Sequence, residues 1–113
     1  MDSPAELNNI EDVVLKLKQE QAVMLYFYSN NCAPCISLRP KVIDLVKQEF
    51  PRMELFLVNS EKHAEIAAAH NCFSNPTLIL YFEGREFRRM SKYISIPQLS
   101  GEIMRPYALL FED

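Results

Sequence analysis

The sequence predicts an α/β fold in which helices cover both faces of a mixed four-stranded sheet. Two observations support this prediction: apolar runs of strand length alternate with stretches of helical periodicity, and two strands are joined by a short turn. Strands that alternate with helices need crossover connections and lie parallel, whereas a hairpin adds an antiparallel edge. With 113 residues, 49% hydrophobic and 24% charged, residues 1–113 are expected to form a single domain.

The first expected element is a helix that begins almost at the start of the sequence. Residues 3–6, Ser-Pro-Ala-Glu, have the form of a capping box with proline at the first helical position. Apolar residues then recur at helical spacing up to Glu20. If the helix starts at Pro4, no strand fits before it.

Four later segments have the properties of strands. Residues 22–28 form a continuous apolar run rich in strand formers, which predicts a buried, parallel central strand. Residues 53–58 and 77–82 predict a second and a third strand. Residues 83–84, Glu-Gly, predict a tight turn into an edge strand over residues 85–90, which alternates Phe with charge and is expected to be half exposed.

Three further helices are expected between and after these strands, and two of them contain a proline. One starts after Cys32 and should kink near Pro40. A shorter, alanine-rich helix covers residues 61–70. The last starts at Pro97, and Pro106 is expected to bend or split it.

The clearest chemical signal is a pair of cysteines, Cys32 and Cys35, at a junction between a strand and a helix. If Cys32 is the N-cap, its sulfur faces unpaired backbone N–H groups and the positive end of the helix dipole, which stabilise a thiolate. In such motifs the pKa of the thiol falls from about 8.5 to between roughly 3.5 and 7.5. Cys32 is therefore the expected nucleophile, and Cys35 is close enough to resolve a mixed disulfide. Pro34 suits the first turn of a helix because it needs no amide partner there.

This spacing alone leaves other uses open: half of a zinc site, or two small residues packed at a helix end. A structural zinc site needs four ligands, and the remaining candidates, Cys72, His63 and His70, contain no second close pair. No metal and no other cofactor is therefore expected. Cys72 is interpreted as a small, half-buried loop residue, with a regulatory or dimer-forming thiol as the alternative.

Taken together, these motifs resemble those of the thioredoxin superfamily, and specifically a small thioredoxin-like protein. The residues that carry the resemblance are C-A-P-C at 32–35, Pro40, N-P-T at 75–77 and E-G-R at 83–85. The resemblance covers nearly the whole chain from the central strand onward. It implies a thioredoxin-like three-layer α/β/α sandwich whose first strand is replaced by the N-terminal helix. It also implies that the Asn75–Pro76 bond is cis and lies opposite the cysteines, where the backbone pairs with substrate.

Several positions depart from the family pattern. Asn31 stands where thioredoxins carry tryptophan, and Ala33 stands where they carry glycine. Tyr26 occupies the position of a buried acid that assists proton transfer to and from Cys35, so water or a tyrosine hydroxyl would have to serve. Tyr93 is expected to replace part of the missing aromatic surface. The residues expected to contact substrate are Asn31, Asn75, Pro76 and Tyr93.

The resemblance and the cysteine pair together imply a thiol–disulfide oxidoreductase, in particular a protein-disulfide reductase that serves cell redox homeostasis. Its partners would be disulfide-containing protein substrates and a reductant such as thioredoxin reductase or glutathione. A thioredoxin-like binding or chaperone module with weak or no redox turnover is the alternative, favoured by Asn31 and Tyr26. A third interpretation has the cysteine pairs of two chains sharing an iron–sulfur cluster or zinc.

Composition and charge argue against other classes of function. The formal net charge is −3 with the two signs interspersed, so nucleic-acid binding is not expected. The first residues lack the basic and apolar regions of a signal peptide, and no apolar window approaches the 18 residues of a membrane span. Three cysteines are too few for a secreted disulfide framework. A monomer in the cytoplasm, without a membrane partner, is therefore expected.

Overall fold

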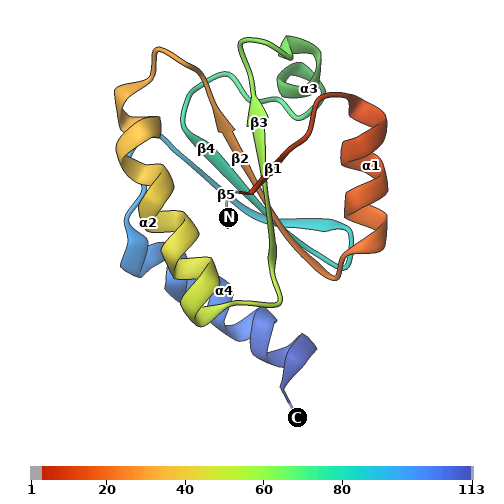
Figure 1. Cartoon of the computed structure of the whole chain (residues 1–113). Helices are drawn as coiled ribbons and strands as arrows, with labels where there is room; N and C mark the ends of the chain where they lie inside the picture. Colours follow the sequence, from red (N-terminus) through yellow and green to blue (C-terminus); the bar gives the residue numbers. More distant parts are fainter. Residues whose placement is uncertain (1–3, 113) are drawn as a thin grey trace.

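The computed structural model describes residues 4–112 and shows one mixed, five-stranded sheet between helices (Figure 1). The strands, in chain order, are β1 (Ala5–Glu6), β2 (Ala22–Tyr28), β3 (Glu54–Asn59), β4 (Thr77–Phe82) and β5 (Arg85–Ser91). Their order in the sheet is β1-β3-β2-β4-β5. β1, β3 and β2 run parallel, whereas β4 and β5 are antiparallel to their neighbours. The α/β prediction with a mixed sheet is confirmed.

Two helices cover each face of the sheet, which makes the fold a three-layer α/β/α sandwich. One face carries α1 (Ile10–Gln19) and α3 (Ala64–Ala69), and the other carries α2 (Ala33–Glu49) and α4 (Ile96–Phe111) (Figure 1). The central strand β2 is buried along its whole length because both of its faces are covered. Its side chains alternate, so Tyr26 and Tyr28 face α2 and α4 while Leu25 and Phe27 face α1 and α3.

The start of the chain differs from the sequence-based expectation. The predicted helix from Pro4 and the four-stranded sheet are wrong: Ala5 and Glu6 form strand β1, in register with Phe56 and Leu57 of β3. α1 begins only at Ile10, and Ser3 of the predicted capping box lies outside the described residues.

The physical reason is that the open edge of β3 offers unpaired backbone groups to the segment before α1. The Leu7 N–H, for example, donates to the carbonyl of Leu57 at 2.9 Å. A better helix cap follows, since the Asn9 side chain accepts from the Asp12 N–H at 2.8 Å. The strand that opens the family's fold is thus present, as a two-residue strand.

Both helices with an internal proline are continuous, so Pro106 does not split α4. The turn between β4 and β5 has positive φ at Glu83 (54°) and Gly84 (80°), the conformation expected of a two-residue hairpin. Within residues 4–112, none of the helices has the length and apolarity required to cross a membrane.

Candidate functional site

Cys32 and Cys35 form a disulfide at the start of α2, with their Cα atoms 5.2 Å apart. Cys32 is the N-cap of the helix, and its Sγ accepts a hydrogen bond from the Cys35 N–H at 3.2 Å. Ala33 and Pro34 fill the first two helical positions and are exposed. Cys32 is partly exposed whereas Cys35 is completely buried. A large substrate therefore has direct access to only one of the two sulfur atoms.

A second loop reaches the same edge of the sheet. Thr77 at the start of β4 is paired with Phe27 near the end of β2, so the loop before β4 lies beside the loop that leads to Cys32. The Asn75–Pro76 peptide bond in this loop is cis. The carbonyl of Pro76 accepts a hydrogen bond of 2.9 Å from the N–H of Lys92, which ties the loop to the segment after β5.

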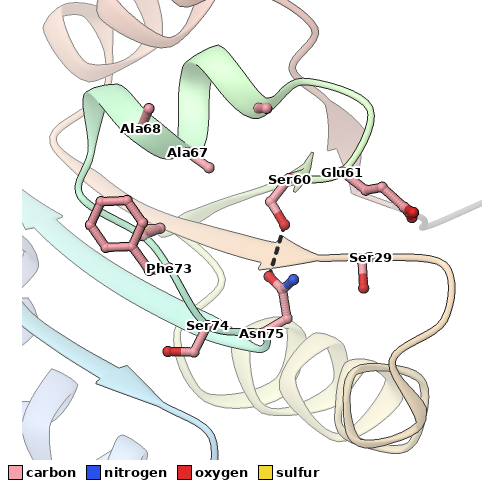
Figure 2. A pocket seen from close by; sticks show the side chains of 10 residues that line it. Ser29, Ser60, Glu61, Ala67, Ala68, Phe73, Ser74 and Asn75 are labelled. Atoms are coloured by element: carbon pink, nitrogen blue, oxygen red, sulfur yellow. Dashed lines mark hydrogen bonds between the residues drawn. The ribbon is translucent and has the colours of Figure 1, made fainter.

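One side of the cis-proline loop borders a hollow of about 510 Å³, which we call the Phe73 hollow (Figure 2). Its lining residues are Ser29, Ser60, Glu61, Ala64, Ala67, Ala68, Cys72, Phe73, Ser74 and Asn75. Ser60 Oγ and Asn75 Oδ1 are 2.9 Å apart, and the hydroxyl also lies 3.0 Å from the Tyr28 carbonyl. Phe73 is 83% exposed, although it is a large apolar side chain. Its ring is therefore available to a partner that docks on this hollow.

A second hollow, of about 410 Å³, lies against the first turn of α2, and we call it the Tyr93 hollow. Pro34 and Lys41 line it from α2, and Lys92 and Tyr93 line it from the segment after β5. Tyr93 is 96% exposed, which leaves its ring available to a partner. Asn31 is exposed too, and it lines neither hollow.

The sequence predicts Tyr93 as a contact residue but does not identify Phe73. The signal was present in the sequence as a large apolar residue three positions before Pro76, within the polar stretch Asn-Cys-Phe-Ser-Asn. A phenylalanine in a loop of small polar residues has no helical or strand periodicity to explain it. Only the tertiary structure shows that Phe73 is exposed at the hollow beside the cis-proline loop (Figure 2).

Beneath the cysteines, four polar side chains form a cluster against the sheet. Tyr26 is completely buried, and its hydroxyl donates to the Cys35 carbonyl at 2.5 Å. Tyr28 donates to Glu6 Oε2 at 2.6 Å, and the Arg39 guanidinium lies 4.4 Å from the centre of the Tyr28 ring. We call these four side chains, Glu6, Tyr26, Tyr28 and Arg39, the polar cluster.

Burial raises the pKa of Tyr26 to about 12, although the nearby charge of Arg39 opposes the rise. The phenol is therefore neutral at ordinary pH, and it is a hydrogen-bond donor rather than a base for the Cys35 thiol. The sequence predicts that a tyrosine hydroxyl or water replaces the missing acid, but it does not identify Glu6 or Arg39. Arg39 could have been found from its spacing, because it lies one helical turn after Cys35.

Cys72 is only 7% exposed and belongs to the apolar core on the face of α1 and α3. Burial raises the pKa of its thiol, with a smaller opposing effect from Arg89. The exposure that a dimer-forming thiol needs is thus missing. His63 Nε2 lies 3.1 Å from Asn8 Oδ1, and His70 Nδ1 forms a hydrogen bond with the carbonyl oxygen of Ile66. Within residues 4–112, no three His, Cys, Asp or Glu side chains converge in a way that could hold a metal ion.

Comparison with known proteins points to one family. The family model described as Thioredoxin matches residues 5–103. The thioredoxin-like protein YdfQ of Bacillus subtilis is 27% identical over 103 residues, which cover 91% of this chain and 91% of the relative. The thioredoxin of Mycoplasma genitalium is 27% identical over 84 residues, covering 74% of this chain and 81% of the relative.

Solved structures agree with this assignment at the level of the fold. A mutant thioredoxin from Halobacterium salinarum superposes with a TM-score of 0.80 at 21% identity, covering 88% of this chain and 87% of the other. The family match includes both disulfide-forming cysteines, and together these findings support a thiol–disulfide oxidoreductase. The resemblance inferred from the sequence motifs is therefore confirmed, and the chain belongs to the thioredoxin family.

Proposed function

We propose that this protein is a cytoplasmic protein-disulfide reductase that contributes to cell redox homeostasis. The observation that carries the proposal is the asymmetry of the pair: Cys32 is accessible at a helix N-terminus, whereas Cys35 is buried beneath it. An accessible sulfur with backbone N–H donors suits attack on a substrate. A buried neighbouring sulfur suits the second, intramolecular step, because only a disulfide already linked to Cys32 comes within its reach.

The reaction proceeds in two exchange steps. The Cys32 thiolate attacks one sulfur of the substrate disulfide, a bond forms between them, and the other substrate sulfur leaves as a thiolate and takes a proton from water. Cys35 then loses its proton and attacks Cys32 Sγ. The mixed disulfide breaks, the second substrate sulfur leaves, and two electrons have passed from the Cys32–Cys35 dithiol to the substrate. A reductant such as thioredoxin reductase or glutathione restores the dithiol.

The surfaces beside the cysteines suit a protein substrate. The Phe73 hollow and the Tyr93 hollow lie next to the cis-proline loop and to Pro34, and each presents an exposed aromatic ring. Aromatic side chains of this kind are frequent anchors in protein interfaces. In this proposal Asn75 and Pro76 align the substrate backbone, while Phe73 and Tyr93 contact its flanking side chains.

The test is reduction of insulin by dithiothreitol in the presence of the protein. Wild-type protein is expected to accelerate the reaction, and Cys32→Ser is expected to abolish the acceleration. Equal rates for these two proteins would contradict the proposal. Cys35→Ser should retain substrates as mixed disulfides on Cys32, and the double variant Cys32→Ser/Cys35→Ser reveals any linkage through Cys72.

A binding or chaperone module with little turnover is the second candidate. It is favoured by Tyr26, a neutral phenol that leaves Cys35 without a base. This candidate predicts that Cys32→Ser suppresses aggregation of an unfolded client as well as the wild type does, while neither protein accelerates insulin reduction.

A further inference from the structure

Arg39 is a partly buried charge on the helix that carries the redox disulfide. It lies on α2, one turn after Cys35, and helical side chains lean toward the N-terminus of their helix. Its guanidinium is 4.4 Å from the centre of the Tyr28 ring and 6.0 Å from that of Tyr26. The side chain thus extends between α2 and the central strand, on the face of the sheet that also buries Cys35.

The Arg39 guanidinium is incompletely paired in the disulfide form. Its Nε is buried and has no hydrogen-bond partner among residues 4–112. Stacking on Tyr28 offsets part of the desolvation, since a guanidinium is attracted to an aromatic face. A buried donor without an acceptor still has an unfavourable free energy, which an anion nearby would reduce. Reduction of the disulfide produces a group in this region that can become such an anion, the Cys35 thiol.

Besides Arg39, the charged or ionisable groups near Cys35 are Cys32, the two tyrosines of β2 and Glu6. From β2, the Tyr26 hydroxyl donates to the Cys35 carbonyl. The Tyr28 ring contacts Arg39, and the Tyr28 hydroxyl donates a hydrogen bond of 2.6 Å to the carboxylate of Glu6 in β1. Cys32 lies on the same turn of α2. Among the described residues, the buried side chains of polar or charged type are Asn59 and Thr77, so no carboxylate, lysine or histidine is buried on this face. Arg39 is the cation that lies over the rings of Tyr26 and Tyr28 on this face.

We propose that Arg39 is a positioning residue that stabilises the thiolate of Cys35 and so compensates for the absence of a base at Tyr26. A positive charge held in a poorly solvated environment favours the ionised form of a thiol. Cys35 then loses its proton to water at a lower pH, attacks Cys32 Sγ and releases the substrate thiolate in the step described above. The inference rests on the proposed function, because it assigns a second-step role within the same cysteine pair.

The first test measures the pKa of the Cys35 thiol directly, by ¹³C NMR of labelled cysteine in a Cys32→Ser background. Arg39→Met is expected to raise this pKa by about 1 pH unit or more, the usual effect of losing an adjacent opposite charge. Arg39→Lys retains the charge and should restore most of the lower value. Arg52→Met is the matched control, because Arg52 also lies over an aromatic ring, Phe111 at 4.5 Å, in contacts separate from the cysteines.

The second test is the redox equilibrium of the Cys32–Cys35 pair with glutathione at a series of pH values. In Arg39→Met the thiolate of the reduced form is less stable. At pH values above the pKa of wild-type Cys35, the equilibrium constant should therefore shift toward the disulfide by about tenfold, which equals about 30 mV for two electrons. The difference should shrink below that pKa, where both proteins carry the neutral thiol. A purely structural role for Arg39 would shift the equilibrium equally at every pH.

The outcomes separate the two proposals. If wild-type protein does not exchange with glutathione and does not reduce insulin, the proposed function fails. If it does both, but Arg39→Met has the same Cys35 pKa and the same pH dependence as wild type, only the role of Arg39 is overturned. Circular dichroism checks that the variants fold, and Arg39→Gln replaces Arg39→Met if the latter does not.

Discussion

The Tyr26 hydroxyl donates a hydrogen bond of 2.5 Å to the carbonyl oxygen of Cys35, which links the central strand to the first turn of α2. Tyr26 stands at the sequence position where the family's pattern has a carboxylate. A phenol donates there and does not accept a proton, because burial raises its pKa to about 12. In the mechanism that we propose, water deprotonates the second thiol and the charge of Arg39 stabilises the resulting thiolate.

Tyr26→Phe is expected to lower the free energy of unfolding at pH 7 by about 1 kcal/mol, the usual contribution of one hydrogen bond. It should also change how the free energy of unfolding depends on pH in the alkaline range. The Tyr26 pKa is 10.0 in the unfolded chain and about 12 in the fold, so the unfolded state releases its proton first and stability falls as the pH rises between these values.

Burial also raises the pKa values of Tyr28 and Tyr81, so both residues likewise make stability fall as the pH rises. Tyr26→Phe should therefore remove only part of the loss of stability at alkaline pH. Denaturant unfolding between pH 8 and pH 12 measures the free energy of unfolding of both proteins. The control is Tyr93→Phe, since the ring of Tyr93 is 96% exposed. A curve for Tyr26→Phe that is as steep as that of wild type would contradict the assigned burial.

Asn9→Ala is expected to destabilise the protein by about 1 kcal/mol, because the Asn9 side chain caps α1 through the Asp12 N–H. Gln19→Ala, at the exposed last position of the same helix, is the control and should change stability little. Thermal or denaturant unfolding measures both. If Asn9→Ala is neutral, α1 does not start where the structure places it.

The two glycines are expected to respond to alanine with opposite signs. Gly101 lies inside α4, and outside the local helix backbone no atom lies within 4 Å of the place that an alanine Cβ would take, so Gly101→Ala should stabilise the protein by about 0.5–1 kcal/mol. Gly84 has φ of 80°, so Gly84→Ala should destabilise it by about 1 kcal/mol. Denaturant midpoints of the two variants provide the comparison, and shifts of the same sign would contradict it.

Phe73→Ala is expected to raise the KM for a protein disulfide about fivefold, which corresponds to roughly 1 kcal/mol of lost apolar contact. Turnover of a small disulfide peptide without flanking residues should be unchanged, since the cysteines are not altered. Phe87→Ala, which removes an aromatic ring from the edge strand β5, is the matched control. Equal KM values for Phe73→Ala and wild type on insulin would show that substrates do not use the Phe73 hollow.

Local signals were sufficient for most of the fold and for the reactive pair. The apolar run of β2 and the Glu83-Gly84 turn each depend on neighbouring residues, so periodicity and turn chemistry identify them. Cys32 and Cys35 are recognisable for the same reason, because both their spacing and the helix start are properties of one short segment.

Long-range packing decided the rest. Residues 3–6 have a good capping pattern, yet Ala5 and Glu6 pair with β3, a partner about fifty residues away that no local pattern can reveal. The polar cluster joins three separate segments, and the hollow at Phe73 forms between α3 and the loop that precedes β4. The chain's cysteine chemistry is thus determined within one short segment, whereas the charge beneath Cys35 and the surface beside it exist only once distant segments are packed together.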